Sequence, residues 1–472
     1  MADAPHDPQS EALPPVLEKL SQPESLREIV QDEEQEFAAP ASPRSKLALA
    51  VRALQHRNFQ LFFAGQLISL VGTWMQTVAQ SWLVYRMTNS ALLLGAVGFA
   101  SQIPVFIMAP VGGIIADRRN RQRVVIGTQT ASMILAGILA ALTLSGRVQV
   151  WHIMVLAAGL GVVNAFDIPA RQAFLIDMVG REDLMNAIAL NSSMFNGARV
   201  IGPAVAGILV ATIGEGWCFF ANAVSYIAVI AGLMLMRIQN PAKLAKEGSP
   251  LQHILEGFAF AKNTGPMRSI LLLLGLVSFV GMPYTVLMPV FADRILHGGA
   301  RGLGILMCST GVGALLGAAS LAARVGLRGL GRLIALCAVG FGASLVLFAF
   351  SKIFWLSTVL LLPVGFFIMV QMASSNTLIQ AMVPDDLRGR ALAVYTMMFM
   401  GMAPFGALFA GAAAHRIGSP WTVAAGGLAS IVGGALFWTQ LPAFRREARE
   451  LVLAQGMMAG TPAQGANSGG LS

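Results

Sequence analysis

The sequence predicts an all-helical integral membrane protein with twelve transmembrane helices. Two observations lead to this prediction. Of the 472 residues, 56% are apolar and only 12% are charged, whereas about a quarter of the residues in a soluble domain are charged. Apolar runs of roughly 20 residues also recur along most of the chain, and each is long enough to cross the hydrocarbon core of a bilayer. A water-soluble fold of this length would need far more surface charge.

Glycine, proline and clusters of charge divide the apolar sequence into twelve spans. The first six are residues 59–85, 91–116, 124–145, 150–166, 187–213 and 217–236. The second six are residues 269–291, 302–323, 330–350, 354–379, 391–414 and 421–441. We therefore expect two six-helix halves, residues 58–237 and 268–441, joined by a linker at 238–267 that carries a surface helix near 251–261.

The basic residues predict the orientation of the spans. If both termini are cytoplasmic, 25 of the 32 Lys and Arg residues lie on the cytoplasmic side, six lie in outer loops, and one, Arg199, lies inside a helix. This distribution follows the positive-inside rule. Residues 1–57 then form a cytoplasmic tail, expected to be mostly disordered because it is polar and acidic, and residues 442–472 form a second cytoplasmic tail.

An internal repeat indicates that the two halves are parallel. A shift of 204 positions places residues 187–189 (Ala-Ile-Ala) on residues 391–393 (Ala-Leu-Ala). The same shift superimposes three pairs of glycines, which are Gly197 with Gly401, Gly202 with Gly406, and Gly207 with Gly411. Parallel halves related by an axis along the membrane normal are a known transporter architecture, with the substrate bound between the halves near the midplane.

Several function classes are disfavoured by what the sequence lacks. It contains no Gly-x4-Gly-Lys-Ser/Thr pattern, which disfavours an ATP-driven pump. The six histidines fall in tails, loops or helix ends, so the helices hold no constellation for hydrolysis, and we expect no enzyme. The three cysteines are too far apart for a metal cluster. We expect no cofactor, no metal and no nucleic-acid partner.

A glycine near the end of the second predicted span is followed by an aspartate and a basic cluster, and these residues are Gly113, Asp117, Arg118 and Arg121. This segment resembles the signature loop of the major facilitator superfamily. Asn120 stands where the family has a second glycine, and asparagine tolerates the left-handed conformation that glycine would supply. A basic loop that only sets topology is the simpler alternative.

The resemblance also implies an inner gate. It pairs Arg121 with Asp167, which the predicted spans place at the inner end of the fourth helix, and Arg171 is the alternative partner of Asp167. Asp117 would then oppose the start of the eleventh helix, near residues 387–391. The alternative is that these charges are static anchors of the topology.

The fifth predicted span carries a second motif, formed by Gly197, Gly202, Pro203 and Gly207. It is similar to the glycine–proline motif of the antiporter branches of the superfamily, although such glycines also serve ordinary close packing. The drug-antiporter branch has an arginine four residues before a glycine in the fourth helix, but Val155 occupies that place before Gly159.

Residues 169–192 and 383–390 resemble the bacterial enterobactin-exporter-like subfamily, and the likeness extends over residues 57–441. This resemblance implies proton-coupled antiport that exports a siderophore, a metabolite or a drug from the bacterial cytoplasmic (inner) membrane. The expected partners are a small-molecule substrate and the lipid bilayer, and we expect a monomer. Uptake of a metabolite is one alternative. A sensor or assembly partner that moves no substrate and uses its acidic tail as a contact arm is another.

Polar residues inside the spans are the candidates for lining a substrate cavity. In the first span, Gln66, Thr73, Gln76 and Gln80 share one helical face. In the tenth span, Gln371 and Asn376 are weaker candidates. Uncharged polar groups in lipid prefer the bundle interior or a wet cavity, and they also hold helices together by hydrogen bonds. Both roles therefore remain open for these residues.

Arg199 is the basic residue that lies deepest in a predicted span, and such a charge is costly unless it is paired or hydrated. We therefore expect Arg199 to face the cavity and to bind an anionic or acceptor-rich substrate, with Ser192 and Asn196 on the same face. A structural pairing with another helix is the alternative. No acidic residue falls in the middle of a predicted span, so the sequence leaves the site of proton coupling open.

Overall fold

The architecture of the helical body is given by a computed structural model, which describes residues 51–238, 250–324, 326–327 and 329–458. The acidic segment predicted as an N-terminal tail lies largely outside these residues, as does the last part of the C-terminal tail. All the long helices that the structure describes belong to one compact unit, Ala53–Ser472.

The described residues contain twelve helical spans that are long and apolar enough to cross a membrane, which confirms the predicted number. Ten of them are single helices. Those of the first half are α4 (Arg57–Thr88), α5 (Ala91–Arg118), α6 (Arg121–Leu144), α7 (Val150–Val179), α8 (Leu184–Thr212) and α9 (Glu215–Leu235). Those of the second half are α13 (Gly299–Ala322), α14 (Leu330–Phe350), α15 (Phe354–Met382) and α18 (Ser419–Thr439).

The seventh and eleventh spans are interrupted. The seventh, Gly265–Ile295, contains α11 (Gly265–Leu276), the π-helical turn η2 (Val277–Gly281), α12 (Tyr284–Val290) and the π-helical turn η3 (Phe291–Ile295). In the eleventh, α16 (Asp385–Met400) and α17 (Met402–Ile417) meet at Gly401. Wide π turns inside α-helices often mark functional positions.

Among the described residues, three further helices lie outside the spans. A short 3-10 turn, η1 (Arg52–Gln55), precedes α4. In the linker, α10 (Pro250–Asn263) covers the stretch where the sequence predicts a surface helix. After α18, the chain continues as α19 (Leu441–Met458), so part of the expected tail is helical and packs against α11 and α15.

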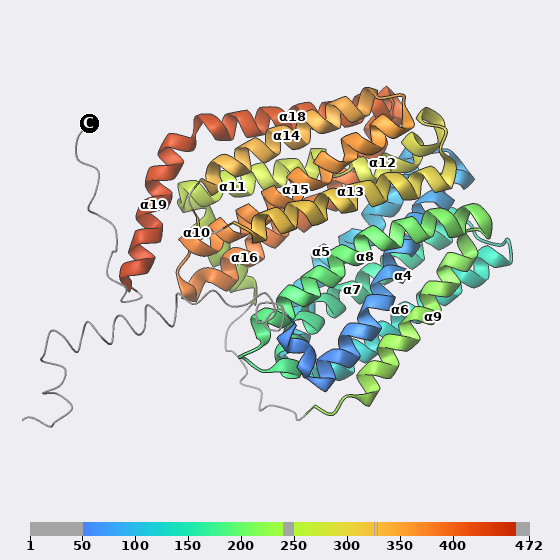
Figure 1. Ribbon diagram of the computed structural model, residues 1–472, viewed down its shortest axis with the longest axis horizontal. Coiled ribbons are helices and arrows are strands. Elements are labelled where there is room, and N and C mark those ends of the chain that lie inside the picture. The colour runs from blue at the N-terminus through green and yellow to red at the C-terminus, as the bar shows by residue number, and fades with distance from the viewer. Residues whose placement is uncertain (1–50, 239–249, 325, 328, 459–472) are drawn as a thin grey trace, which may run out of the picture. The chain divides into compact units, whose positions relative to one another are not determined.

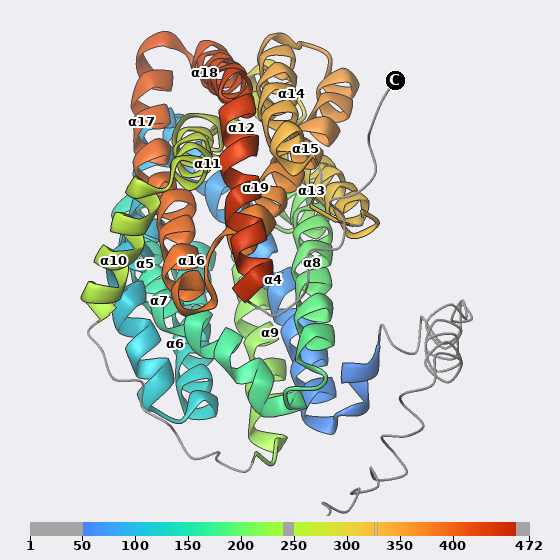
Figure 2. The ribbon, with the colours of Figure 1, turned by 90° about the vertical axis from the view of Figure 1, so that its left-hand side faces the viewer.

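The helices form two groups with the same internal packing. In the first half α5 packs on α7, and α6 packs on α7 and α9; in the second half α13 packs on α15, and α14 packs on α15 and α18. Figure 1 shows the blue-to-green helices as one group and the yellow-to-red helices as the other, and Figure 2 shows the same two groups one above the other. The contacts between helices therefore divide the spans into two groups with matching internal packing.

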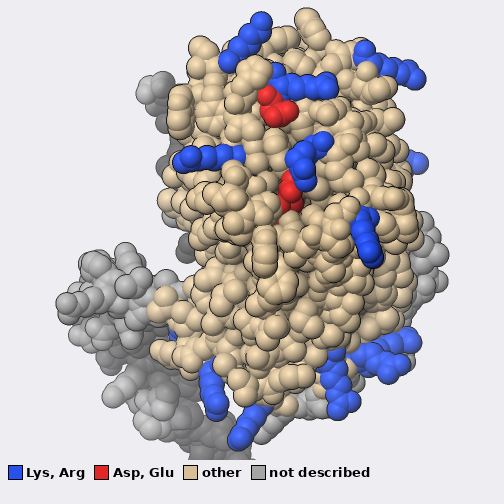
Figure 3. All heavy atoms as spheres, turned by 90° about the vertical axis from the view of Figure 1, so that its right-hand side faces the viewer, with Lys and Arg blue, Asp and Glu red and all other residues tan. Residues whose placement is uncertain are grey.

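Two pairs of helices make the most extensive contacts between the halves. These are α8 with α13, and α5 with α17. The helical body has a basic end, which carries the α5–α6 loop around Arg119, and a far end, which carries the α4–α5 loop around Asn89. Figure 3 shows the side that lies to the right in Figure 1, where basic side chains are scattered over a mostly uncharged surface.

One span is much longer than predicted. The fourth span was expected to end at residue 166, before Pro169, but α7 continues to Val179. Proline removes one backbone donor, so the carbonyl of Ala165 loses its usual partner in the helix. That carbonyl instead faces Gly112 of α5, where a Cβ atom would collide with it. Close packing of α5 against α7 thus accommodates the proline without ending the helix.

Candidate functional site

A cavity of about 1030 Å³ lies between the two halves. Its walls come from α4, α5, α7, α8 and α9 of the first half, and from the seventh span, α13 and α16 of the second half. Small-molecule sites typically have volumes of roughly 300–1,000 Å³. The cavity is therefore large enough for an organic molecule of several hundred daltons.

The cavity is closed toward the far end. There its lining residues Val84, Leu94 and Leu303 are buried. Toward the basic end, the lining residues Gln172 and Thr396 are exposed. Solvent therefore reaches the cavity from the basic end.

Two glycine contacts form the closure at the far end. A Cβ atom on Gly207 of α8 would lie 3.0 Å from the Cα atom of Gly304 on α13. A Cβ atom on Gly411 of α17 would lie 2.9 Å from the Cα atom of Gly95 on α5. Gly207 and Gly411 are equivalent in the 204-residue repeat, and each contacts the second span of the opposite half. The absence of side chains lets the two halves touch backbone to backbone.

The other members of the α8 motif have different surroundings. Gly202 packs against α4, because a Cβ atom there would collide with Cβ of Trp74. Pro203 lines the cavity. Gly197 has open space where its Cβ would be. The motif therefore combines packing within the first half at Gly202 with contact between the halves at Gly207.

The polar face of α4 is divided between two environments. Thr73, Gln76 and Gln80 line the cavity, as the sequence predicts. Gln66 is buried at 2% exposure and does not line it. Neighbouring Gly65 shows why: a Cβ atom there would lie 2.9 Å from the backbone oxygen of Ala228, so this part of α4 packs tightly on α9.

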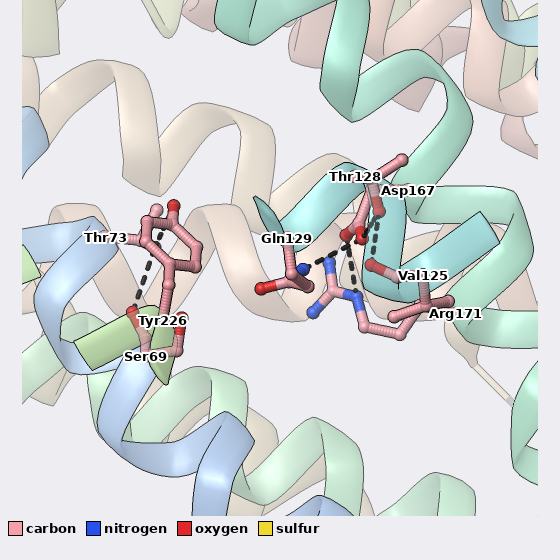
Figure 4. Close-up of polar contacts among 8 residues, drawn as sticks. All are labelled: Ser69, Thr73, Val125, Thr128, Gln129, Asp167, Arg171 and Tyr226. Atoms are coloured by element: carbon pink, nitrogen blue, oxygen red, sulfur yellow. Dashed lines mark hydrogen bonds and ion pairs between the residues drawn. The ribbon is translucent and has the colours of Figure 1, made fainter. Parts of the chain in front are cut away.

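Gln76 is also part of a polar contact at the cavity wall. Its Oε1 atom accepts a hydrogen bond of 2.6 Å from Nδ2 of Asn222 on α9. Nearby, the hydroxyl groups of Thr73 and Tyr226 lie 3.4 Å apart. Figure 4 shows the Thr73–Tyr226 contact. These contacts hold α4 and α9 together and leave polar groups facing the cavity.

Four other predicted cavity residues lie outside the cavity lining, so for them the structure corrects the prediction. Ser192 is exposed, and Asn196 donates its amide to the carbonyl of Ser192, 2.9 Å away on the same helix. Gln371 is fully buried, and Asn376 accepts a hydrogen bond from Gln380 within α15. The helical period correctly groups Ser192 and Asn196 with Arg199, but it cannot show how far along α8 the cavity extends.

Arg199 lines the cavity in the middle of α8. Its guanidinium carbon lies 5.8 Å from the centre of the Trp74 ring. Phe195 packs edge-on against the same ring, with centroids 5.6 Å apart. A cation over an indole face is attracted by the ring quadrupole. The sequence does not reveal this stack, because Trp74 and Arg199 are far apart along the chain.

The predicted pair between Arg121 and Asp167 is wrong. Arg121 instead contacts Asp177, with Nη1 2.9 Å and 3.1 Å from the two carboxylate oxygens, and it also donates to the carbonyl of Ala173. The reason is the length of α7: Asp177 lies ten residues beyond Asp167, about 15 Å along the helix. Because the predicted span ended at residue 166, Asp177 was not considered as a partner of Arg121.

Asp167 lies inside α7 and is buried at 3% exposure, which corrects its expected position at the membrane edge. Its Oδ2 atom lies 3.1 Å from Nε of Arg171, the alternative partner suggested by the sequence. Its Oδ1 atom accepts hydrogen bonds from Thr128 at 2.8 Å and from Gln129 at 2.9 Å. Figure 4 shows Asp167 among these three side chains of α6 and α7.

The signature loop differs from the expectation at three positions. Gly113 has open space where its Cβ would be, and the close approach to α7 occurs at the preceding Gly112. Asn120 has an extended backbone, with φ −65°, and it caps α6 by accepting a hydrogen bond from the backbone of Arg123. Asp117 is exposed at the basic end, beside exposed Arg118, and no described ion pair joins it to the start of the eleventh span.

Comparison with known proteins identifies the family. Residues 48–458 match the family described as "Transmembrane secretion effector". A staphyloferrin A transporter of Staphylococcus aureus is 27% identical over 380 residues, covering 80% of this chain and 94% of that protein. An enterobactin exporter of Shigella boydii is 26% identical, covering 83% and 93%. A multidrug efflux pump of Mycolicibacterium fortuitum is 26% identical, covering 74% and 87%.

Solved structures share the fold at low sequence identity. The nucleoside transporter NupG superposes with a TM-score of 0.63 at 17% identity, covering 82% of this chain and 98% of that one. An inward-facing, unoccupied bacterial homologue of the human lysosomal transporter Spinster gives 0.62 at 15%, covering 83% and 97%. The chain belongs to the transmembrane secretion effector family of major facilitator transporters, and it is a multi-pass membrane transporter rather than an enzyme.

Proposed function

We propose that this transporter exports a small molecule across the bacterial cytoplasmic membrane by alternating access, in exchange for protons. In this proposal the basic end faces the cytoplasm and both termini are cytoplasmic, because the Lys and Arg residues follow the positive-inside rule in that orientation. Each chain encloses a complete cavity between its own halves, so the protein acts as a monomer.

The observation that supports this proposal most directly is the one-sided closure of the cavity. The cavity is sealed at the far end by Gly207 against Gly304 and by Gly411 against Gly95, and it is open at the basic end. Because the two halves have equivalent packing, rocking one half against the other would separate these glycines and close the opposite end. The structure then corresponds to the state that loads substrate from the cytoplasm.

The names of two relatives favour export. One relative is named an enterobactin exporter and another a multidrug efflux pump. Export requires loading from the cytoplasm, and the state with an open basic end is suited to that step.

Asp167 is the acidic side chain furthest from a helix end in the described spans, and we assign proton exchange to it. Its carboxylate holds together Arg171, Thr128 and Gln129. Protonation of Asp167 would remove the negative charge that attracts Arg171 and the hydrogen-bond donors Thr128 and Gln129. Loss of these contacts would loosen α6 from α7 in the half that carries the polar cavity wall.

Comparison of metabolites in a strain that lacks the transporter tests the proposal. Small molecules inside the cells and in the medium are measured by mass spectrometry for the deletion strain and its complement, with and without a protonophore. We expect one compound to accumulate inside the deletion strain and to leave only when the protein and the proton gradient are both present. Depletion from the medium by active protein would show uptake, and no difference in any compound would favour a sensor that moves no substrate.

A further inference from the structure

Arg199 is the one charged side chain among the described residues that line the cavity. The same lining contains no Asp, Glu, Lys or His. Within the described residues, Arg199 forms no ion pair. A full positive charge therefore faces the cavity between the halves without a carboxylate from the cavity lining to balance it.

The guanidinium group is held in place by aromatic rings rather than by an acid. Trp74 lies under it at 5.8 Å, and Phe195 supports Trp74 from the side. Gly202, on the same helix as Arg199, leaves the room that Trp74 needs to approach α8. A guanidinium that lies over an aromatic ring and pairs with no acid keeps N–H donors from which a carboxylate or a similar acidic group can accept two parallel hydrogen bonds.

The two halves contribute different chemistry to the cavity. All the amide side chains in the lining come from the first half, and they are Gln76, Gln80, Gln102, Asn164, Gln172 and Asn222. All the methionines come from the second half, and they are Met282, Met307, Met397 and Met400. Methionine side chains are flexible and polarisable, so such a wall can adapt to apolar groups of varied shape.

We infer that the substrate is an amphipathic organic anion, which binds with its acidic group at Arg199 on the first half and its apolar body on the methionine wall of the second half. This inference rests on the proposed function and specifies the substrate class of the same cavity. A cation would meet the charge of Arg199 with no acidic side chain in the cavity lining to offset the repulsion, so we expect cationic compounds to bind weakly. Among the activities named for the relatives, this disfavours efflux of cationic drugs.

Three dansyl probes of similar size and different charge test this inference by direct binding. Dansylglycine carries a carboxylate, dansylglycinamide is neutral, and dansylethylenediamine carries an ammonium group. Binding to the purified full chain in nanodiscs of uncharged lipid is followed by dansyl emission. A hydrogen-bonded charge contributes about 1.5–3 kcal/mol, so we expect the anion to bind roughly ten- to hundredfold more tightly than the neutral probe. The cation should bind most weakly.

Variants of single cavity residues show which side chain causes the preference for the anionic probe. Arg199→Gln should reduce the preference for dansylglycine over dansylglycinamide to within about twofold, while Arg199→Lys should keep most of it. Met397→Ala should weaken all three probes alike, because it removes apolar surface and no charge. Binding of the neutral probe to Arg199→Gln also shows that this variant is folded.

Two results would overturn the inference. One is an unchanged preference for the anion in Arg199→Gln, and the other is binding of the cation as tightly as the anion. Failure of the proposed function is seen separately, because these binding measurements require no transport. A protein that shows the Arg199-dependent preference but moves no compound in cells would contradict export and leave the substrate class standing.

Discussion

Replacement of Gly304 by alanine should shift the transporter away from the conformation seen here. The new Cβ atom would lie 2.6 Å from both the Cα atom of Gly207 and the carbonyl oxygen of Pro203. Ordinary contact begins near 3.4 Å, so α8 and α13 would have to separate by about 0.8 Å. Neither neighbour is a flexible side chain, so the strain cannot be relieved by a change of rotamer.

The size of the shift follows from the cost of overpacking, which is typically about 1–3 kcal/mol. The clash exists only while the far end is closed, so this cost changes the ratio of the two states by roughly 5- to 150-fold. The gain in helix propensity from glycine to alanine applies to both states and does not alter the ratio. Gly137→Ala on α6 is the matched control, because no atom lies within 4 Å of its added Cβ.

Spin labels at the far end measure this change. Spin labels are attached at Arg147→Cys in the first half and at Lys352→Cys in the second half, both on exposed loops. The native cysteines Cys218, Cys308 and Cys337 are replaced beforehand. Double electron–electron resonance should show a larger population of long distances for Gly304→Ala than for wild type or Gly137→Ala. Identical distance distributions in all three proteins would refute the assignment of Gly304 to the far-end closure.

Three further predictions concern the charged groups. Asp167→Asn should lower thermal stability, because breaking a buried pair costs about 3–5 kcal/mol. The double variant Asp167→Asn with Arg171→Gln should recover part of this loss, and an additive loss would contradict the pairing. Arg121→Ala and Asp177→Asn should each reduce transport. A double-mutant cycle of the two should show a coupling energy of at least about 0.5 kcal/mol, and additive effects would contradict a functional pairing of Arg121 with Asp177. Asp117→Asn should slow transport more than it weakens probe binding, and a pure loss of affinity would argue against a gate at this exposed position.

The number and type of the spans could be predicted because they depend on local composition. Apolar length and basic loops are visible residue by residue, and ten of the twelve predicted spans correspond to single helices. The error at the fourth span had a specific cause. Pro169 looks like the end of a helix in the sequence, yet its missing hydrogen bond is tolerated where Gly112 packs against the carbonyl of Ala165.

The site was predicted only where a single helix determines it. The face of α4 that carries Thr73, Gln76 and Gln80 follows from helical periodicity, and the depth of Arg199 follows from its position in the span. Contacts between helices could not be obtained in this way. The stack of Arg199 on Trp74 and the methionine wall depend on how separate helices meet, and no spacing along the chain encodes that geometry.

The most direct test of alternating access measures both ends of the helical body together. The Arg147–Lys352 label pair reports on the far end, and a second pair at Arg123 and Gly389, both exposed, reports on the basic end. Distances are recorded in nanodiscs for wild type and for Gly304→Ala. We expect reciprocal changes, with long distances at the far end gained as long distances at the basic end are lost. Independent changes at the two ends, or a far end that never opens, would contradict the proposed transport cycle.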